Sequence, residues 1–252
     1  MEYFVLSWGT GLVAPWLRPK IKRAQSVIAD WLERTNSRVY LSISGGKDSL
    51  VAASLIQSVY PQCPMVWINQ GHLAEWEDCI ELLYFLRDEW GWNIVELCPP
   101  RGLLQLYKDI GLPLEGTMNT SQDKLINQKL MYNVLNEYQE LNDIQGYAWG
   151  LRKESKGRAM YLKCHGELYQ KKDGLWICSP VGYWKTEHIW QYIDSQKLPY
   201  ASIYDRDRMT VRNGCPIGTT GANWGRIADL KINYPELYQE FIYYFPEIQS
   251  YS

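Results

Sequence analysis

One short motif constrains the fold of this chain more than any other part of its sequence. Ser44-Gly45-Gly46-Lys47-Asp48-Ser49 directly follows the apolar run Val39–Ile43 and opens the helix-like run Leu50–Ile56. A strand, a glycine turn and a helix N-terminus in this order favour an anion site, because glycines let consecutive N–H groups and the helix dipole face phosphate oxygens. The motif therefore predicts an α/β protein with a phosphorylated ligand; the plain alternative is a glycine turn that only caps a helix.

The side chains of the motif suit the same ligand. Ser44 and Ser49 offer hydroxyl donors, and Lys47 adds a positive charge. Asp48 falls in the first helical turn, where it can cap the helix or, with ATP bound, hold Mg²⁺. The motif is not a Walker P-loop, because that pattern needs glycine in place of Leu41 and Ser or Thr in place of Asp48.

Short β-branched or aromatic runs alternate with longer stretches of helical periodicity. The predicted strands are Arg38–Ile43, Met65–Asn69, Asn93–Leu97, Gly146–Gly150 and Leu175–Cys178. The predicted helices are Lys20–Arg34, Asp48–Val59, Ala74–Trp90, Gln122–Leu141, Thr186–Gln196, Arg226–Leu230 and Pro235–Phe245. This alternation predicts a parallel five-stranded sheet flanked by helices, with the ligand at the carboxyl ends of the strands.

The same patterns predict how the chain is organised. Residues 1–37 form a helical lead-in, residues 38–180 the nucleotide-binding α/β domain, and residues 181–252 a helical C-terminal extension of that domain. Gly102–Ser121 contains three glycines and a proline, which predicts a mobile loop over the ligand edge.

Composition narrows the classes of partner. Lys and Arg number 26 against 28 Asp and Glu, so charge does not indicate nucleic acid. No apolar run reaches the roughly 18 residues of a spanning helix, and no basic stretch precedes the apolar N-terminal residues, which predicts a cytoplasmic protein without a membrane partner. Twelve Trp and nineteen Tyr favour ligand pockets and subunit interfaces, such as those of a homodimer or a partner subunit.

The cysteines are spread along the chain. They stand at positions 63, 79, 98, 164, 178 and 215, so no Cys-x-x-Cys pair is present. This spacing predicts buried reduced thiols and no iron–sulfur cluster.

A second basic stretch follows the fourth predicted strand. Gly150 ends that strand, and Arg152, Lys153, Lys156 and Arg158 come next. Arginine forks suit a polyphosphate, and the stretch would lie at the same sheet edge as the glycine motif. The alternative is a solvated basic loop. His165 and His188 have no nucleophile or ligand set to pair with and are expected to be structural.

These stretches together resemble the family of PAPS reductases, ATP sulfurylase small subunits and related ATP pyrophosphatases. Ser44–Ser49 is similar to the pyrophosphate-binding loop of that family, and Asn69-Gln70-Gly71 stands at its turn beside the adenosine. Gly150–Arg158 is similar to its G-x-R-x-x-E-S-x-x-R segment, with Glu154 one place early. The closing L-P-Y…Y-D…G-C stretch is matched by Leu198-Pro199-Tyr200, Tyr204-Asp205 and Asn213-Gly214-Cys215.

The resemblance implies a Rossmann-like fold of the adenine nucleotide alpha-hydrolase type. It also implies ATP and Mg²⁺ as cofactors, with Asp48 as the metal ligand. The implied nucleotide-binding residues are Ser44, Gly45, Gly46, Lys47, Ser49, Asn69, Gly71 and Gly150. The implied catalytic residues are Lys47, Asp48, Arg152 and Arg158.

The intact loop favours ATP as the nucleotide. The resemblance then implies an ATP pyrophosphatase-type enzyme that adenylylates an acceptor, whether sulfate, a carboxylate or a nucleobase carbonyl, and releases pyrophosphate. The C-terminal stretch Tyr234–Ser252 lacks the cysteine of the reductases. Two alternatives remain: a thiol-dependent sulfonucleotide reductase of sulfur metabolism with Cys215 as its nucleophile, and a non-catalytic nucleotide-binding subunit of a larger complex.

Overall fold

The computed structural model describes residues 14–71, 74–112, 121–154, 158–209 and 226–251. Backbone proximity divides the chain into two compact units. The first unit consists of Met1–Trp67, Asp78–Glu96 and Gln139–Arg212. The second consists of Ile68–Glu77, Leu97–Tyr138 and Asn213–Ser252. Asn213, Gly214, Cys215 and Lys156, which the sequence singles out, lie outside the described residues.

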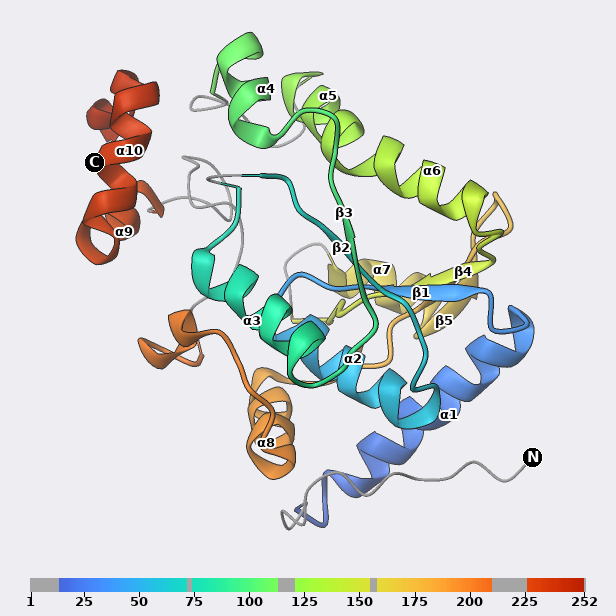
Figure 1. The fold of residues 1–252 in the computed structure, drawn as a ribbon. Coiled ribbons are helices and arrows are strands. Elements are labelled where there is room, and N and C mark those ends of the chain that lie inside the picture. The colour runs from blue at the N-terminus through green and yellow to red at the C-terminus, as the bar shows by residue number, and fades with distance from the viewer. Residues whose placement is uncertain (1–13, 72–73, 113–120, 155–157, 210–225, 252) are drawn as a thin grey trace. The chain divides into compact units, whose positions relative to one another are not determined.

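A six-stranded sheet is the core of the first unit (Figure 1). Its strands are β1 (Val39–Ser42), β2 (Met65–Ile68), β3 (Ile94–Leu97), β4 (Gly146–Ala148), β5 (Leu168–Gln170) and β6 (Trp176–Cys178), in the order β3-β2-β1-β4-β6-β5. β1 runs parallel to β2 and β4, and β4 runs parallel to β6. The predicted α/β fold with a sheet flanked by helices is confirmed.

The prediction of five strands, all parallel, was wrong by one strand. β5 is a sixth strand, antiparallel to β6, with Tyr169 opposite Ile177. It contains only Leu168, Tyr169 and Gln170, without a β-branched residue and with the charged Glu167 and Lys171 on either side, so the sequence carries no strand signal there.

The strand order reverses at β1. The chain passes from β1 to β2 and β3 on one side and then returns to place β4 on the other side of β1. In open α/β sheets, ligands bind outside the carboxyl ends of the strands at such a switch point. The glycine motif follows β1 directly and therefore stands at the position where this topology favours a ligand.

Helices cover both faces of the sheet in the first unit. α1 (Arg18–Arg34) packs beside α2 (Lys47–Val59) on one face, where Trp31 of α1 closely approaches the backbone of Gly146. α8 (Thr186–Gln196) packs on α2, with Tyr192 Oη 3.2 Å from Ser54 Oγ (Figure 1). α7 (Arg158–His165) lies on the opposite face, where Tyr161 contacts Trp149 and Tyr169.

The second unit is helical. It contains α4 (Leu103–Ile110), α5 (Ser121–Asn127), α9 (Arg226–Asn233), α10 (Pro235–Tyr244) and a 3₁₀ segment, Pro246–Tyr251. A π-helical segment, Gln128–Tyr132, joins α5 to α6 (Asn133–Leu141), so the single helix predicted over Gln122–Leu141 contains a π-turn. α3 (Glu77–Asp88) starts at the boundary of the two units.

The prediction of a loop over Gly102–Ser121 was wrong for Leu103–Ile110, which forms α4. Gly102 is the extended residue before the helix, and Gly111, with φ of +81°, ends it. Leu103, Leu106 and Tyr107 are buried, at the spacing of one helical face. The glycines are therefore helix ends, and residues 113–120 lie outside the described part. Within the described ranges, no helix has the length and apolar character needed to cross a membrane.

Candidate nucleotide site

The turn between β1 and α2 depends on one glycine. Gly45 has φ of +65°, and a Cβ at this position would lie 2.7 Å from the carbonyl oxygen of Cys79 in α3. Gly46, with φ of −77° and ψ of 149°, has an extended backbone open to other residues. The left-handed conformation that the glycine motif allows is therefore at Gly45, which also permits close packing of the turn on α3.

The two serines of the motif contact each other across the turn. Ser49 Oγ donates to the carbonyl of Gly46 at 2.9 Å and accepts a hydrogen bond from the backbone N–H of Ser44 at 3.3 Å. The hydroxyl oxygens of Ser44 and Ser49 are 3.3 Å apart. In this structure the Ser49 hydroxyl thus fixes the shape of the loop.

Lys47 is the first residue of α2 and is only 5% exposed. Its Nζ lies 5.0 Å from the centre of the Tyr204 ring, and its backbone N–H donates to Tyr204 Oη at 3.2 Å. Tyr204 comes from a 3₁₀ turn, Ser202–Asp205, and its ring packs edge-on against Trp190 of α8. Sequence reasoning did not name Tyr204 as a site residue, although the Y-D pair of the closing motif was the signal that pointed to it.

The end of β4 packs directly on the first turn of α2. A Cβ at Gly150 would lie 2.5 Å from the backbone nitrogen of Ser49 and 2.6 Å from the carbonyl carbon of Asp48. Backbone atoms cannot give way as a flexible side chain can, so only glycine fits at this position. Gly150 thereby joins the second predicted motif to the first.

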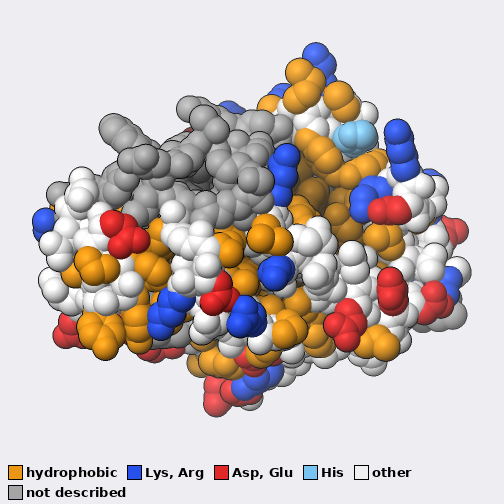
Figure 2. All heavy atoms as spheres, turned by 90° about the horizontal axis from the view of Figure 1, so that it is seen from above, with side chains coloured by type: hydrophobic (Ala, Val, Ile, Leu, Met, Phe, Trp, Pro, Cys, Tyr) orange, Lys and Arg blue, Asp and Glu red, His pale blue; other side chains and the backbone are white. Residues whose placement is uncertain are grey.

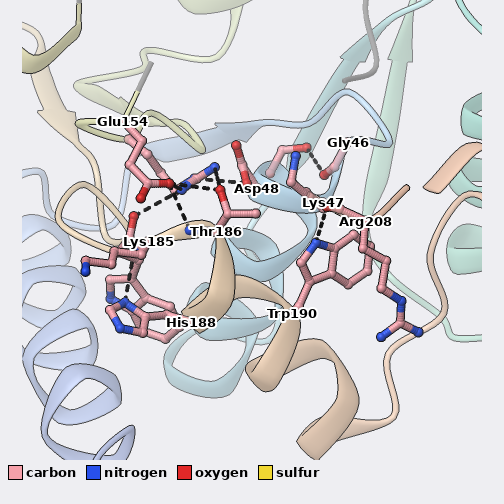
Figure 3. A network of polar contacts seen from close by, with 12 residues as sticks. Gly46, Lys47, Asp48, Glu154, Lys185, Thr186, His188, Trp190 and Arg208 are labelled. Carbon is pink, nitrogen blue, oxygen red and sulfur yellow. Dashed lines mark hydrogen bonds and ion pairs between the residues drawn. The ribbon is translucent and has the colours of Figure 1, made fainter. Parts of the chain in front are cut away.

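Arg152 is the centre of a polar network that links three segments. Figure 3 labels three of its partners, Asp48, Glu154 and Thr186. The side chain is nearly buried, and its Nη1 donates to Glu154 Oε2 at 2.7 Å and to the carbonyl of Trp184 at 3.1 Å. Nη2 donates to Thr186 Oγ1 at 3.1 Å. Nε lies 3.0 Å from Asp48 Oδ1 as an ion pair, but neither of these two atoms makes a hydrogen bond to the described residues.

Glu154 connects the same network to α8. Its Oε2 accepts hydrogen bonds from the backbone N–H and the hydroxyl of Thr186, both at 2.9 Å. Burial alone would raise the pKa of Glu154, but the hydrogen bonds from Thr186 and Arg152 outweigh it and lower the pKa below its usual value. The charged form of Glu154 therefore stabilises the start of α8.

Asp48 can supply one carboxylate to a metal ion. Mg²⁺ is commonly held by one or two carboxylates together with substrate phosphates, so Asp48 fits it as part of an ATP complex. The described residues contain no group of three His, Cys, Asp or Glu that could hold a metal by itself. Arg152 fixes one oxygen of Asp48, because the ion pair faces Oδ1.

Arg158 and Lys153 differ from Arg152 in their surroundings. Arg158 is exposed at the first position of α7, and Lys153 is exposed with its backbone N–H bonded to the carbonyl of Gly182. The sequence predicted that this basic stretch as a whole faces a polyphosphate, and the structure places a helix from Arg158 onward. The stretch thus contains one buried and two exposed cations among its described residues.

Asn69 and Gly71 belong to the second unit. The backbone N–H of Gly71 donates to Asn69 Oδ1 at 3.0 Å, and Gly71 has φ of +88°. The carbonyl of Gln70 accepts from the N–H of Leu103 at 2.8 Å. These residues form a tight turn after β2, as the family resemblance implies.

The histidine at the start of α8 is structural, as expected. His188 Nδ1 accepts a hydrogen bond from the backbone N–H of Lys185 at 2.9 Å (Figure 3). Burial, followed by the charge of Lys20, lowers the pKa of His188. The neutral ring can therefore accept the bond from Lys185 at neutral pH.

The five cysteines in the described part of the chain are reduced thiols. Burial raises the pKa of Cys63 to about 12 and also raises that of Cys178, so neither is a thiolate at neutral pH. Cys98 and Cys164 are exposed. Cys215, the nucleophile of the reductase alternative, is outside the described residues.

Comparison with known sequences settles the family. The sequence pattern of the phosphoadenosine phosphosulfate reductase domain matches residues 38–221. The chain belongs to this family. The match begins at β1 and includes the glycine motif, the Arg152 stretch and the closing motif, so the predicted PAPS reductase resemblance is confirmed.

The individual proteins that the chain resembles in sequence are distant relatives. The chain is 26% identical over 226 residues to an uncharacterized protein of Methanocaldococcus jannaschii, covering 87% of this chain and 44% of that protein. It thus spans less than half the length of that relative. It is 22% identical over 222 residues to adenosine 5'-phosphosulfate reductase of Bacillus anthracis, covering 82% of this chain and 88% of that enzyme.

Solved structures share the fold. PAPS reductase from Candida auris in complex with phosphate has a TM-score of 0.56 at 15% identity, covering 79% of this chain and 94% of that one. FMN adenylyltransferase of Candida glabrata with FAD and inorganic pyrophosphate has a TM-score of 0.57 at 14% identity, covering 80% and 63%. The U34-tRNA thiolase NcsA of Methanococcus maripaludis with its [4Fe-4S] cluster has a TM-score of 0.53 at 18% identity, covering 92% and 80%.

Proposed function

We propose that the chain is an ATP pyrophosphatase-type enzyme that adenylylates an acceptor and releases pyrophosphate. The observation that carries the proposal is the strand–turn–helix loop at the switch point of the sheet, with Lys47 held against Tyr204 at the N-terminus of α2. The first N–H groups of a helix have no intrahelical partners, and the helix dipole favours negative charge there. Such a loop suits a leaving group that gains negative charge.

In this proposal an oxyanion of the acceptor attacks the α-phosphorus of ATP in line. A new oxygen–phosphorus bond forms, the bond between the α-phosphorus and the bridging oxygen breaks, and pyrophosphate leaves into the loop. Ser44–Ser49 bind the pyrophosphate, and Lys47 stabilises its developing charge. No covalent protein residue is needed, so positioning and electrostatics supply the catalysis.

The remaining predicted residues take supporting roles in the proposal. Asp48 would hold Mg²⁺, which neutralises phosphate charge when it is bound with ATP. Arg152 would position Asp48 through their ion pair, and Arg158 would contact the phosphates from α7. Asn69 and Gly71 as adenosine contacts, and Gly150 as a nucleotide contact, stay predictions of the resemblance.

Two observations support ATP chemistry over a structural role for the loop. The buried atoms Asp48 Oδ1 and Arg152 Nε pair with each other at 3.0 Å and make no further hydrogen bond to the described residues. A carboxylate held by one ion pair suits a site that a metal ion or a phosphate completes. The fold is also shared with an adenylyltransferase whose structure holds FAD and pyrophosphate.

The direct test is pyrophosphate release by the purified chain from ATP and Mg²⁺ in the presence of pooled metabolites. Lys47→Ala should lower turnover about 100-fold, the usual effect of removing one preorganised donor, because the charge on pyrophosphate grows towards the transition state. AMP affinity should stay near wild type, since AMP lacks the β- and γ-phosphates. Wild-type turnover in Lys47→Ala would refute the loop as the pyrophosphate site.

A reductase is the second candidate, because the family and the Bacillus anthracis relative carry that name. This candidate needs a thiolate, and Cys215 would supply it. Thioredoxin-dependent sulfite release that is lost in Cys215→Ser, without pyrophosphate release from ATP, would favour the reductase. Binding of ATP without either activity would favour the nucleotide-binding subunit, alone or as a homodimer.

A further inference from the structure

A group of aromatic side chains in the first unit has no role in the site described above. Tyr147 and Trp149 lie on and just after β4, Tyr161 and His165 lie on α7, and Tyr169 lies on β5. None of the five is buried: His165 is exposed, and the other four are partly exposed. We refer to these five side chains as the aromatic shelf.

The rings of the aromatic shelf form a continuous series of contacts. Ring centres are 5.7 Å apart for Tyr147 and Trp149, 5.8 Å for Trp149 and Tyr161, and 5.5 Å for Tyr161 and Tyr169. His165 stacks on Tyr169 at 4.5 Å. On the face shown in Figure 2, hydrophobic side chains gather around a hollow. Three separate elements thus present partly exposed rings on one surface.

Two contacts fix the shelf in place. Trp149 Nε1 donates to the hydroxyl of Ser179 at 2.7 Å, and Ser179 is only 1% exposed. Tyr147 stacks at 5.7 Å on Tyr40, a core residue of β1 that lies opposite it in the sheet. The orientation of both rings is therefore set before a ligand arrives, which lowers the entropic cost of binding.

The shelf begins at the carboxyl end of β4, on the face of the sheet that α7 covers. Trp149 directly precedes Gly150, whose backbone packs on Asp48 and Ser49 in the first turn of α2. β4 is the immediate neighbour of β1 in the sheet. Trp149 therefore stands at the carboxyl end of the strand next to the pyrophosphate loop, at the edge where ligands of such sheets bind.

The chemistry of the shelf discriminates between classes of acceptor. Aromatic faces bind planar ring systems by stacking, with little dependence on which ring is bound. Sulfate or an aliphatic carboxylate would gain nothing from five partly exposed rings and would need cationic donors instead. Partly exposed, preoriented rings at a ligand edge thus favour a planar partner.

We infer that the acceptor carries a planar aromatic ring system that stacks on the aromatic shelf, with Trp149 as its main contact. The inference rests on the proposed adenylyl transfer and adds to it the class of the acceptor. Trp149 and Tyr161 determine specificity by binding the ring, while the attacking oxyanion belongs to another part of the same acceptor. The ring is that of a small molecule or of a base in RNA, which share this chemistry.

The test starts from the full chain, ATP labelled at the α-phosphate, and Mg²⁺. The small-molecule and RNA fractions of a cell extract are supplied separately, and the labelled product is identified by mass and ultraviolet absorption. We expect a product with an aromatic chromophore, and the fraction that yields it distinguishes the two sources. A labelled product whose acceptor is sulfate or an aliphatic acid would overturn the inference and leave adenylyl transfer in place.

Variants then test the shelf itself. Trp149→Ala and Tyr161→Ala should each raise the acceptor concentration for half-maximal rate about tenfold, in line with the loss of one stacking partner, with the KM for ATP unchanged. Trp149→Phe keeps a ring and should recover most of the affinity. Phe85→Ala removes a 44% exposed ring from α3 and is the matched control, with no expected effect.

Three further outcomes would overturn the inference. Unchanged acceptor dependence in Trp149→Ala and Tyr161→Ala, with both variants folded as judged by circular dichroism, would show that the shelf does not bind the acceptor. A raised KM for ATP in place of the acceptor would assign the shelf to adenine. No labelled product from the wild-type chain would refute the proposed function together with the inference.

Discussion

At the scale of single residues, Gly45 is the residue of the glycine motif that tolerates substitution least. Its φ of +65° costs another residue about 1–2 kcal/mol, and a Cβ would collide with the backbone of Cys79 in α3. We expect Gly45→Ala to lower the free energy of unfolding by about 2–4 kcal/mol, as measured by urea denaturation. Gly91→Ala is a matched control, because Gly91 has the same φ and nothing within 4 Å of the added Cβ.

Comparison of Gly45→Ala with Gly91→Ala separates the cost of the left-handed backbone from the cost of the steric clash with α3. Gly91→Ala should cost only the conformational part, about 1 kcal/mol. An equal loss in the two variants would mean that α3 moves to make room and that the turn is not tightly packed.

Arg152 and Arg158 are a second pair that differ in surroundings. Arg152→Ala removes the cation beside Asp48 and Glu154 and should lower the unfolding free energy by about 3 kcal/mol, because the arginine is nearly buried. Arg158→Ala removes an exposed side chain and should change stability by less than about 0.5 kcal/mol. Both should weaken ATP binding by about 1.5–3 kcal/mol, as measured by calorimetry. Unchanged ATP affinity in both variants would make the stretch structural only.

The residue types of the motif were sufficient to predict its local geometry but not its long-range partners. The motif Ser44–Ser49 predicted a strand end, a glycine turn and a helix start. The helix was predicted to begin at Asp48 and begins at Lys47, one residue earlier. Tyr204 and Thr186 meet the loop and Arg152 from more than 30 residues away. Such contacts depend on tertiary packing, which no local pattern encodes.

At the scale of elements, the start of α8 is held by a carboxylate from outside the helix. Glu154 accepts two hydrogen bonds from Thr186, and its pKa is lowered in the folded chain. A lowered folded pKa means that the unfolded chain binds the proton first as pH falls. The stabilisation by Glu154 is therefore present above the ordinary glutamate pKa of about 4.3 and is lost as pH falls through the lowered value.

Glu154→Gln should remove this pH dependence. The amide oxygen can still accept from Thr186, but it carries no charge for Arg152, so the variant should be less stable than the wild type at pH 7. The difference in unfolding free energy should shrink as the pH falls from about 5 to 3. A difference that stays constant over this range, measured by urea denaturation at each pH, would show that the charge of Glu154 contributes nothing.

The sequence did not predict β5, α7 and α4, because each is a short element whose local sequence signal is weak or points to another structure. β5 has charged neighbours on both sides, and α7 begins at Arg158 within a stretch whose basic residues were interpreted as a polyphosphate site. α4 lies between Gly102 and Gly111, which stand at the two ends of the helix and do not interrupt it. Helices with clear apolar faces were predicted closely: α8 runs over Thr186–Gln196, as expected. Short elements depend on neighbours, whereas longer amphipathic ones carry their own signal.

At the scale of the whole molecule, strand order is what makes the motif a candidate site. The sequence predicted five of the six strands, and hence an α/β sheet, but it did not predict that β4 pairs with β1 after a long helical segment. This pairing places Gly150 and Arg152 against the glycine motif. Pairing partners so distant along the chain follow from packing of the complete sheet, so the sequence predicted only that both stretches lie at the same sheet edge.

At the same scale, we expect the chain to carry no iron–sulfur cluster. A [4Fe-4S] cluster needs several thiolates at one place, and among the described residues no group of three cysteine, histidine or acidic side chains comes together. Cys63 and Cys178 are buried with raised pKa values, which disfavours the thiolate that a cluster requires. We therefore expect the purified protein to show no absorbance near 400 nm and no bound iron or labile sulfide. Cys215→Ser should leave ATP affinity unchanged in calorimetry. A brown preparation whose iron is lost in Cys215→Ser would place this chain with the cluster-bearing thiolase that shares its fold and would make Cys215 a ligand.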